Sequence, residues 1–241
     1  MPTIGLYTAA AGMQAQQKML DSLSNDLANV DTNGYRPGRV QFADLLYQQE
    51  GGLRTGSGVG LNQLGRSDVA GEMAGSQNPL AAAIDGVGFF QVKLADGGTA
   101  LTRVGDFKID VEGNLVTISG NPVDPPVKLP VGTDPEKVLI SPDGTISIDG
   151  GPGVARIQLF EVPSPSALNP IGGGLLQTTV TSGPTTPAAT PSLVQGQIES
   201  SAVDFTAVMA DLVEAQRAYG MQSRMIKTQD QLAQIANDIR R

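Results

Sequence analysis

The two ends of this chain carry the spacing of amphipathic helices, whereas the long middle carries the patterns of strands and turns. In the first 35 residues two sets of side chains recur every seven positions: Leu6, Met13, Leu20 and Leu27, and three positions further on Ala9, Gln16, Leu23 and Val30. This double repeat is the a/d pattern of a coiled coil. Helices at opposite ends of a chain can pack together only if the intervening chain reverses direction and brings the two ends close. The pattern therefore predicts an antiparallel pair of terminal helices.

A second helical stripe runs through the last 39 residues. Its members are Phe205, Val208, Leu212, Ala215 and Tyr219 and then, after a step in phase, Met221, Met225, Thr228, Leu232, Ile235 and Ile239. Such a step is typical of a stutter in the heptad repeat. Several positions in the two stripes are Ala, Gln or Thr, so a lone two-helix hairpin would bury little apolar surface. Either the helices cap the β core of one globular monomer, or they pair with neighbouring chains.

The middle of the chain has the composition and punctuation of a β domain. Gly (30) and Pro (16) are frequent, and Asp-Gly or Gly-Asn pairs mark turns at residues 85–86, 96–97, 113–114, 143–144 and 149–150. We expect short antiparallel strands at residues 87–94, 107–111, 115–119, 138–141, 145–149 and 155–162. A further strand is expected at residues 193–198. The predicted fold class is α+β, with a mainly antiparallel β middle domain.

Four segments follow from these patterns. The expected order is an N-terminal coiled-coil helix (1–35), an extended arm or linker (36–77), a β-rich outer domain (78–200) and a C-terminal coiled-coil helix (201–241) that packs with the first. Within the second segment, residues 40–49 fit a helical turn or an extended arm, and the glycine-rich residues 51–60 a flexible linker. Within the third, the Pro-rich residues 163–192 fit an irregular loop.

Composition argues against most kinds of chemistry. The chain has no His and no Cys, which removes the commonest metal ligands and general bases, and its net charge of -8 argues against nucleic-acid binding. Paired acids such as Asp106 with Asp110, or Asp143 with Asp149, fit turns better than a hydrolytic site. We expect no enzyme, no cofactor, no metal and no membrane span, and the N-terminus lacks the pattern of a cleavable signal peptide.

Adjacent aromatic residues stand out at Phe89 and Phe90, because neighbouring side chains of a strand point to opposite faces. One ring is expected in the core. The other either faces a neighbouring molecule or is covered within the same chain.

The segment Ser24 to Tyr35, SNDLANVDTNGY, strongly resembles the N-terminal signature of the bacterial flagellar axial proteins, which are the rod and hook subunits. The resemblance extends at intervals along the whole chain and is greatest to the distal rod members: Phe42, Asp44–Gln48, Gly88–Val92, Thr102, Arg103, Gly105, Phe107, Gln195, Gly196, Glu199, Leu212, Val213, Gln216–Tyr219, Thr228, Asp230 and Gln231. One departure is that only seven residues separate Gln48 from Gly56, where distal rod members carry a longer insertion. Proximal rod and hook subunits are the alternatives within the family.

The resemblance implies a structural subunit that assembles with its own copies into a helical tube, with the terminal helices inside and the β domain outside. This tube is the drive shaft of the flagellum. It implies as partners other rod and hook subunits, the bushing ring proteins and the flagellar type III export apparatus. It also implies a location in the basal body across the periplasm and cell wall, reached without a cleavable signal. The rival hypothesis is a secreted carbohydrate-binding β protein.

Two groups of residues are predicted to form the contacts between subunits. The seam of the helices is assigned to Leu20, Leu23, Leu27, Leu212, Tyr219, Leu232 and Ile235. Polar contacts that fix register are assigned to Asn25, Asn29, Asn33 and Gln216. For any one of these amides, solvent exposure or helix capping is the alternative.

Overall fold

The computed structural model describes residues 3–44, 47–50, 53–56 and 58–239. The chain divides into two compact units. One unit, here called the hairpin unit, comprises residues 1–28, 38–64 and 204–241. The other, here called the body, comprises residues 29–37 and 65–203. The fold is α+β, as the sequence predicts.

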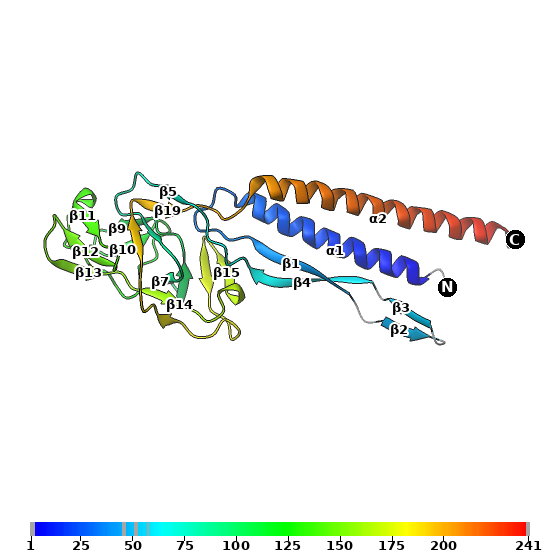
Figure 1. Ribbon diagram of the computed structural model, residues 1–241, viewed down its shortest axis with the longest axis horizontal. Helices are drawn as coiled ribbons and strands as arrows, with labels where there is room; N and C mark the ends of the chain where they lie inside the picture. Colours follow the sequence, from blue (N-terminus) through cyan, green and yellow to red (C-terminus); the bar gives the residue numbers. More distant parts are fainter. Residues whose placement is uncertain (1–2, 45–46, 51–52, 57, 240–241) are drawn as a thin grey trace. The chain divides into compact units, whose positions relative to one another are not determined.

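Two long helices dominate the hairpin unit. Helix α1 (Thr3–Ala28) and helix α2 (Phe205–Ile239) lie side by side and antiparallel (Figure 1). Asp204 caps the start of α2, because its side chain accepts hydrogen bonds from the backbone nitrogens of Thr206 (2.9 Å) and Ala207 (3.1 Å). The terminal helices predicted from the heptad spacing are therefore present, and they contact each other.

Four strands complete the hairpin unit. Strand β1 (Gly38–Asp44) pairs with β4 (Val59–Arg66), and β2 (Tyr47–Glu50) pairs with β3 (Leu53–Gly56). Of the two possibilities for residues 40–49, the extended one is confirmed for residues 40–44 and 47–49, and residues 45 and 46 lie outside the described part. The flexible linker expected at residues 51–60 was wrong where the structure describes it, since its backbone is paired in strands despite the many glycines. Residues 51, 52 and 57 lie outside the described part.

A six-stranded antiparallel sheet forms one side of the body. Its strands follow the order β15-β16-β8-β7-β14-β17. Their bounds are Asn169–Gly172 (β15), Leu175–Gln177 (β16), Thr99–Thr102 (β8), Phe89–Lys93 (β7), Leu159–Glu161 (β14) and Thr186–Pro187 (β17). Three of these strands come from residues 163–192, which the sequence had suggested to be an irregular loop.

Smaller antiparallel sheets make up the rest of the body. A three-stranded sheet has the order β11-β12-β13, and two-stranded sheets pair β9 with β10, β5 with β19 and β6 with β18. Their bounds are Val138–Ile140 (β11), Thr145–Ile148 (β12), Gly153–Arg156 (β13), Phe107–Ile109 (β9), Leu115–Thr117 (β10), Met73–Gly75 (β5), Gln197–Glu199 (β19), Ala82–Ile84 (β6) and Leu193–Gln195 (β18). Short 3-10 helices lie at Pro135–Lys137 and Pro165–Ala167.

Two expected strands are each divided in two, and the one expected at residues 193–198 becomes β18 and β19. Residues 155–162 contribute to β13 of the three-stranded sheet and to β14 of the six-stranded sheet. Between them Ile157 is fully buried, and its backbone nitrogen donates to the carbonyl oxygen of Gly144 at 2.8 Å. The chain thus crosses from one sheet to the other at a residue that remains in the core.

The glycine turns expected from the sequence have the backbone that they require. Gly113 and Gly144 both have φ of +85°, and a Cβ atom at either would lie 2.3 Å from a backbone oxygen, that of Leu129 or Ile157 respectively. A side chain at these positions would meet both strain and collision. These turns therefore depend on glycine.

The core of the body has two hydrophobic clusters, one on each side of β7. Phe90 belongs to the larger cluster, where its ring meets that of Phe107 edge to face at a centroid distance of 5.0 Å. Phe89 belongs to the second cluster with Leu101 and Leu168. The two rings do point to opposite faces. Both are covered within the chain, so the pair leaves no aromatic ring for a neighbour.

Candidate assembly surface and buried ion cluster

The contact between the two helices is built from small residues. A Cβ atom on Gly12 would lie 3.1 Å from the side-chain nitrogen of Gln222, so the Gln222 amide covers this glycine directly. Ala9 and Leu23 share the helix face of Gly12 by their spacing, and both are buried. Small residues let two helix backbones approach closely. The contact therefore relies on close approach more than on large apolar side chains.

Helix α1 is covered on a second side by strands of its own unit. A Cβ on Gly58 would contact Ala11 at 3.2 Å, and one on Gly38 would lie 3.4 Å from the hydroxyl of Ser22. The buried Asp26 carboxylate also accepts a hydrogen bond from the backbone nitrogen of Gly38 at 3.1 Å. These contacts hold β1 and the residue before β4 against α1.

Helix α2 keeps one heptad phase along its contact with α1. Val208, Leu212, Ala215, Tyr219 and Gln222 follow one another at steps of four and three residues, and Val208 and Ala215 are buried. The stutter expected after Tyr219 was wrong for this face. The expectation followed the large apolar residues, whereas the face that meets α1 continues through an amide.

The large apolar residues after Tyr219 form a separate row, here called the α2 outer stripe. It consists of Met221, Met225, Leu232 and Ile235, which are 63%, 56%, 59% and 54% exposed. Their positions in the helix place them away from the face of Gln222. A row of four half-exposed large apolar side chains on one helix is typical of a surface that another molecule covers.

The residues assigned to subunit contacts fall into four sets. Leu23 is buried in the hairpin unit, and Leu20, Leu27, Leu212 and Tyr219 are half-buried there. Leu232 and Ile235 belong to the outer stripe, and Asn25 and Gln216 are exposed. Asn29 and Asn33 are half-buried in the body, where the Asn29 side-chain oxygen accepts from the hydroxyl of Thr32 at 3.2 Å. This bond lies within the turn that follows α1.

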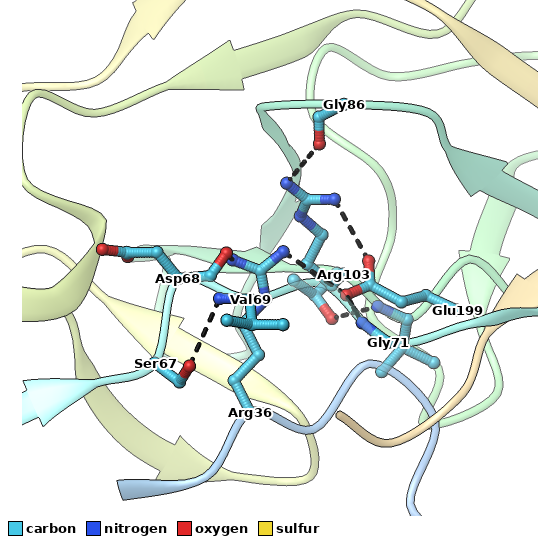
Figure 2. Close-up of polar contacts among 10 residues, drawn as sticks. Arg36, Ser67, Asp68, Val69, Gly71, Gly86, Arg103 and Glu199 are labelled. Carbon is cyan, nitrogen blue, oxygen red and sulfur yellow. Dashed lines mark hydrogen bonds and ion pairs between the residues drawn. The ribbon is translucent and has the colours of Figure 1, made fainter. Parts of the chain in front are cut away.

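A buried ion cluster in the body centres on Glu199. Its carboxylate pairs with the Nη2 atom of Arg36 at 3.3 Å and with the Nη1 atom of Arg103 at 3.1 Å (Figure 2). The Glu199 side chain is 3% exposed and that of Arg103 is 4% exposed. The backbone nitrogen of Gly71 also donates to Glu199 at 3.2 Å. Both carboxylate oxygens are therefore satisfied by donors, as a buried charge requires.

The arginines of this cluster reach further parts of the body. Arg103 donates to the carbonyl oxygen of Gly86 at 2.8 Å, and its guanidinium lies 5.2 Å from the ring centroid of Phe89. Arg36 donates to the carbonyl oxygen of Asp68 at 3.3 Å. Burial lowers the pKa of Arg103, and the charge of Arg36 lowers it further, while Glu199 opposes the shift.

Backbone bonds join the same two segments near the cluster. The nitrogen of Gly34 donates to the carbonyl oxygen of Glu199 at 2.7 Å, and the nitrogen of Ala202 donates to that of Tyr35 at 2.9 Å. Residues 29–37 follow α1 in the chain, and residues 199–203 precede α2. One buried carboxylate thus ties together the segments that lead to both helices.

Sequence reasoning gave the ion cluster no role. Arg103 and Glu199 entered only as positions of the family resemblance, and Arg36 had no predicted role. The partners are 163 and 96 residues from Glu199, so no local spacing signals them. The one signal in the sequence was the position of a charged residue, Glu199, next to the strand expected at residues 193–198.

The paired acids serve turns rather than catalysis. Asp110 accepts hydrogen bonds from the backbone nitrogens of Glu112 and Asn114, both at 2.8 Å. Asp143 accepts from the nitrogen and hydroxyl of Thr145 at 3.2 and 2.7 Å. Across the described ranges, no three acidic, His or Cys side chains gather where they could hold a metal ion. None of the helices, as far as they are described, has the length and apolarity to span a membrane.

Three family models match separate parts of the chain. Residues 6–36 match the flagella basal body rod protein family, residues 83–148 the D1 domain of the flagellar hook proteins FlgE/F/G, and residues 194–239 the C-terminal region of the flagellar basal body rod FlgEFG proteins. The three models together cover both helices and much of the body.

Similar curated proteins match over nearly their whole length. The flagellar basal-body rod protein FlgG of Caulobacter vibrioides is 35% identical over 261 aligned positions, which cover 98% of each chain. FlgG of Buchnera aphidicola subsp. Acyrthosiphon pisum is 35% identical, covering 95% of this chain and 96% of its own. FlgF of Caulobacter vibrioides is 29% identical over 96% of this chain. The chain therefore belongs to the family of flagellar basal-body rod proteins, which are structural and not enzymatic.

Proposed function

We propose that this chain is the subunit of the distal rod and assembles with its own copies into a helical tube that transmits motor torque to the hook and filament. The observation that carries the proposal is the α2 outer stripe, whose apolar side chains α1 does not cover. Identity of 35% to FlgG proteins over nearly the whole length supports the rod assignment. Transmission of torque requires no chemistry, only many contacts that share the load.

We expect the outer stripe of one subunit to contact a different part of the helix surface on the next subunit, so that the two contacting faces are unlike. When such contacts do not close into a ring, they propagate as a helix of indefinite length. We assign contacts between subunits to Leu20, Leu23, Asn25, Leu27, Asn29, Asn33, Leu212, Gln216, Tyr219, Leu232 and Ile235. Of these, Leu232 and Ile235 are the best placed, because they are exposed in the single chain.

The proposal extends to location and partners. A distal rod subunit crosses the periplasm within the basal body, contacts other rod and hook subunits and the surrounding bushing rings, and leaves the cell through the flagellar type III export apparatus.

Leu232→Asp tests the assembly surface. A charge in the outer stripe should abolish rods and motility, while the melting temperature of the isolated chain stays unchanged because Leu232 is 59% exposed. Gln231→Asp adds the same charge one position earlier and should leave assembly intact. Rods that form normally from the Leu232→Asp chain would overturn the stripe assignment.

Leu27→Asp tests the predicted seam in the same assay. Leu27 is half-buried in the hairpin unit, so this change should disturb both the helix contact and assembly. Normal rods and motility in this variant would show that the seam assignment is wrong.

A further inference from the structure

A small pocket in the body opens beside the Glu199 cluster. Three arginines, Arg36, Arg66 and Arg103, contribute to its walls, together with Ser67, Asp68 and the ring of Phe89. Its volume is about 10 Å³. This is space for one particle the size of a water molecule.

The cluster beside the pocket has an excess of buried positive charge. Arg36 and Arg103 each carry one positive charge, are 8% and 4% exposed, and share the single carboxylate of Glu199. A buried charge without a counter-charge is costly. The lowered pKa of Arg103, caused by burial and also by the charge of Arg36, reflects this cost. The cluster therefore needs one more negative charge.

The Nε atoms of Arg36 and Arg103 are buried without a hydrogen-bond partner, which adds to the cost of burying the two charges. A further observation points to the pocket as the place of the missing charge. Arg66, the third arginine of the pocket, lies with its guanidinium 5.1 Å from the ring centroid of Tyr35, and among the described residues it has no ion-pair partner. Asp68 lines the pocket, but its side chain is exposed. Donors and positive charge thus outnumber acceptors around the pocket.

We propose that this pocket binds a monovalent inorganic anion of the size of chloride. A water molecule could occupy the same space but would leave the extra charge uncompensated. Phosphate and sulfate are too large for the volume. The bound anion balances Arg36 and Arg103 and strengthens the junction of the two segments that lead to the helices.

Thermal unfolding of the purified chain at constant ionic strength tests the proposal. Replacing sodium gluconate, whose anion does not fit, by sodium chloride should raise the melting temperature by about 3 °C at tenfold the Kd. Arg66→Gln should weaken chloride binding roughly threefold and Asp68→Asn should strengthen it by a similar factor, because each changes one charge beside the anion. Arg156→Gln, an exposed arginine elsewhere in the body, should behave like the unchanged chain.

Opposite effects of the two pocket variants would support the site even if one of them lowers overall stability. An equal response to chloride in all four chains would overturn it, because the salt effect would then be general. Crystals soaked in bromide give a direct second reading. An anomalous peak between Arg36, Arg66 and Arg103 would support the proposal, and its absence at saturating bromide would refute it.

Discussion

The body and the hairpin unit differ in the size of the side chains that they bury. Every large side chain that is fully buried among the described residues belongs to the body, including Phe90, Phe107 and Ile146. The hairpin unit buries mainly small residues such as Ala9, Ala15 and Ala215, and it exposes the α2 outer stripe. Because burial of apolar area is the main stabilising term, we expect the body to be stable by itself, and we propose that contacts with other molecules complete the hairpin unit.

The largest effect is expected from the core of the body. Phe107→Ala removes a fully buried ring that packs on Phe90, and should lower the free energy of unfolding by about 3–5 kcal/mol. Urea denaturation followed by circular dichroism measures this change. Val131→Ala, at an exposed position of the body, should change stability by less than about 0.5 kcal/mol. Similar losses in both variants would mean that the body lacks a specific core.

Loss of the buried carboxylate should come next. Glu199→Gln leaves Arg36 and Arg103 buried without a counter-charge, and should cost about 3 kcal/mol. The same denaturation assay reports it, with Glu136→Gln at an exposed position as control. If the two variants unfold alike, the ion pairs contribute nothing to the body.

A substitution that removes a buried side chain from the hairpin unit should lower the free energy of unfolding by less. Leu23→Ala removes a buried side chain from the face that meets α2 and should cost about 2 kcal/mol, at the low end for such changes, because small neighbours surround it. Leu232→Ala should leave the isolated chain within about 0.5 kcal/mol of the original. Thermal unfolding, followed as helix content against temperature, distinguishes the two variants. A larger loss of stability from Leu232→Ala than from Leu23→Ala would mean that the outer stripe is buried within the single chain.

The smallest effect concerns the exposed turns of the body. Hydrogen bonds, chiefly from Asn114 to Asp110 and from Thr145 to Asp143, hold the pKa of each carboxyl below its ordinary value of 3.8. A depressed pKa in the folded state gives stability that is present above the ordinary value and is lost as the pH falls through the folded-state pKa. The melting temperature should therefore fall slightly more below pH 4 in the original chain than in the double variant Asp110→Asn, Asp143→Asn. Parallel pH profiles for the two chains would refute this role.

The turns and helices could be predicted because their signals are local. Asp-Gly and Gly-Asn pairs favour a positive φ at the glycine, and the φ of +85° at Gly144 and at Gly113 agrees with these two signals respectively. Heptad spacing likewise identified both helices. The strands within residues 163–192 had no such signal, because they are only two to four residues long and because β16 joins the sheet by pairing with the distant strand β8.

The face of α2 was harder to predict than its existence. Hydrophobic spacing gives most weight to large side chains, and here Met221 and Met225 lie on the outer face while Gly12 and Gln222 form the contact. The ion cluster could not be predicted from the sequence, for a different reason. Its members are joined only by tertiary structure, so neither Arg36 nor Glu199 carries a recognisable spacing.

The separation of 163 residues between Arg36 and Glu199 has a consequence for the order of folding. The body also needs β19 to pair with β5 and β18 with β6, so residues 193–199 close contacts that began more than a hundred residues earlier. Contacts of such long range form late, since the whole intervening loop must first be ordered. A chain that emerged N-terminus first through a narrow passage would therefore stay open, and able to keep moving, until all but about its last forty residues had come through.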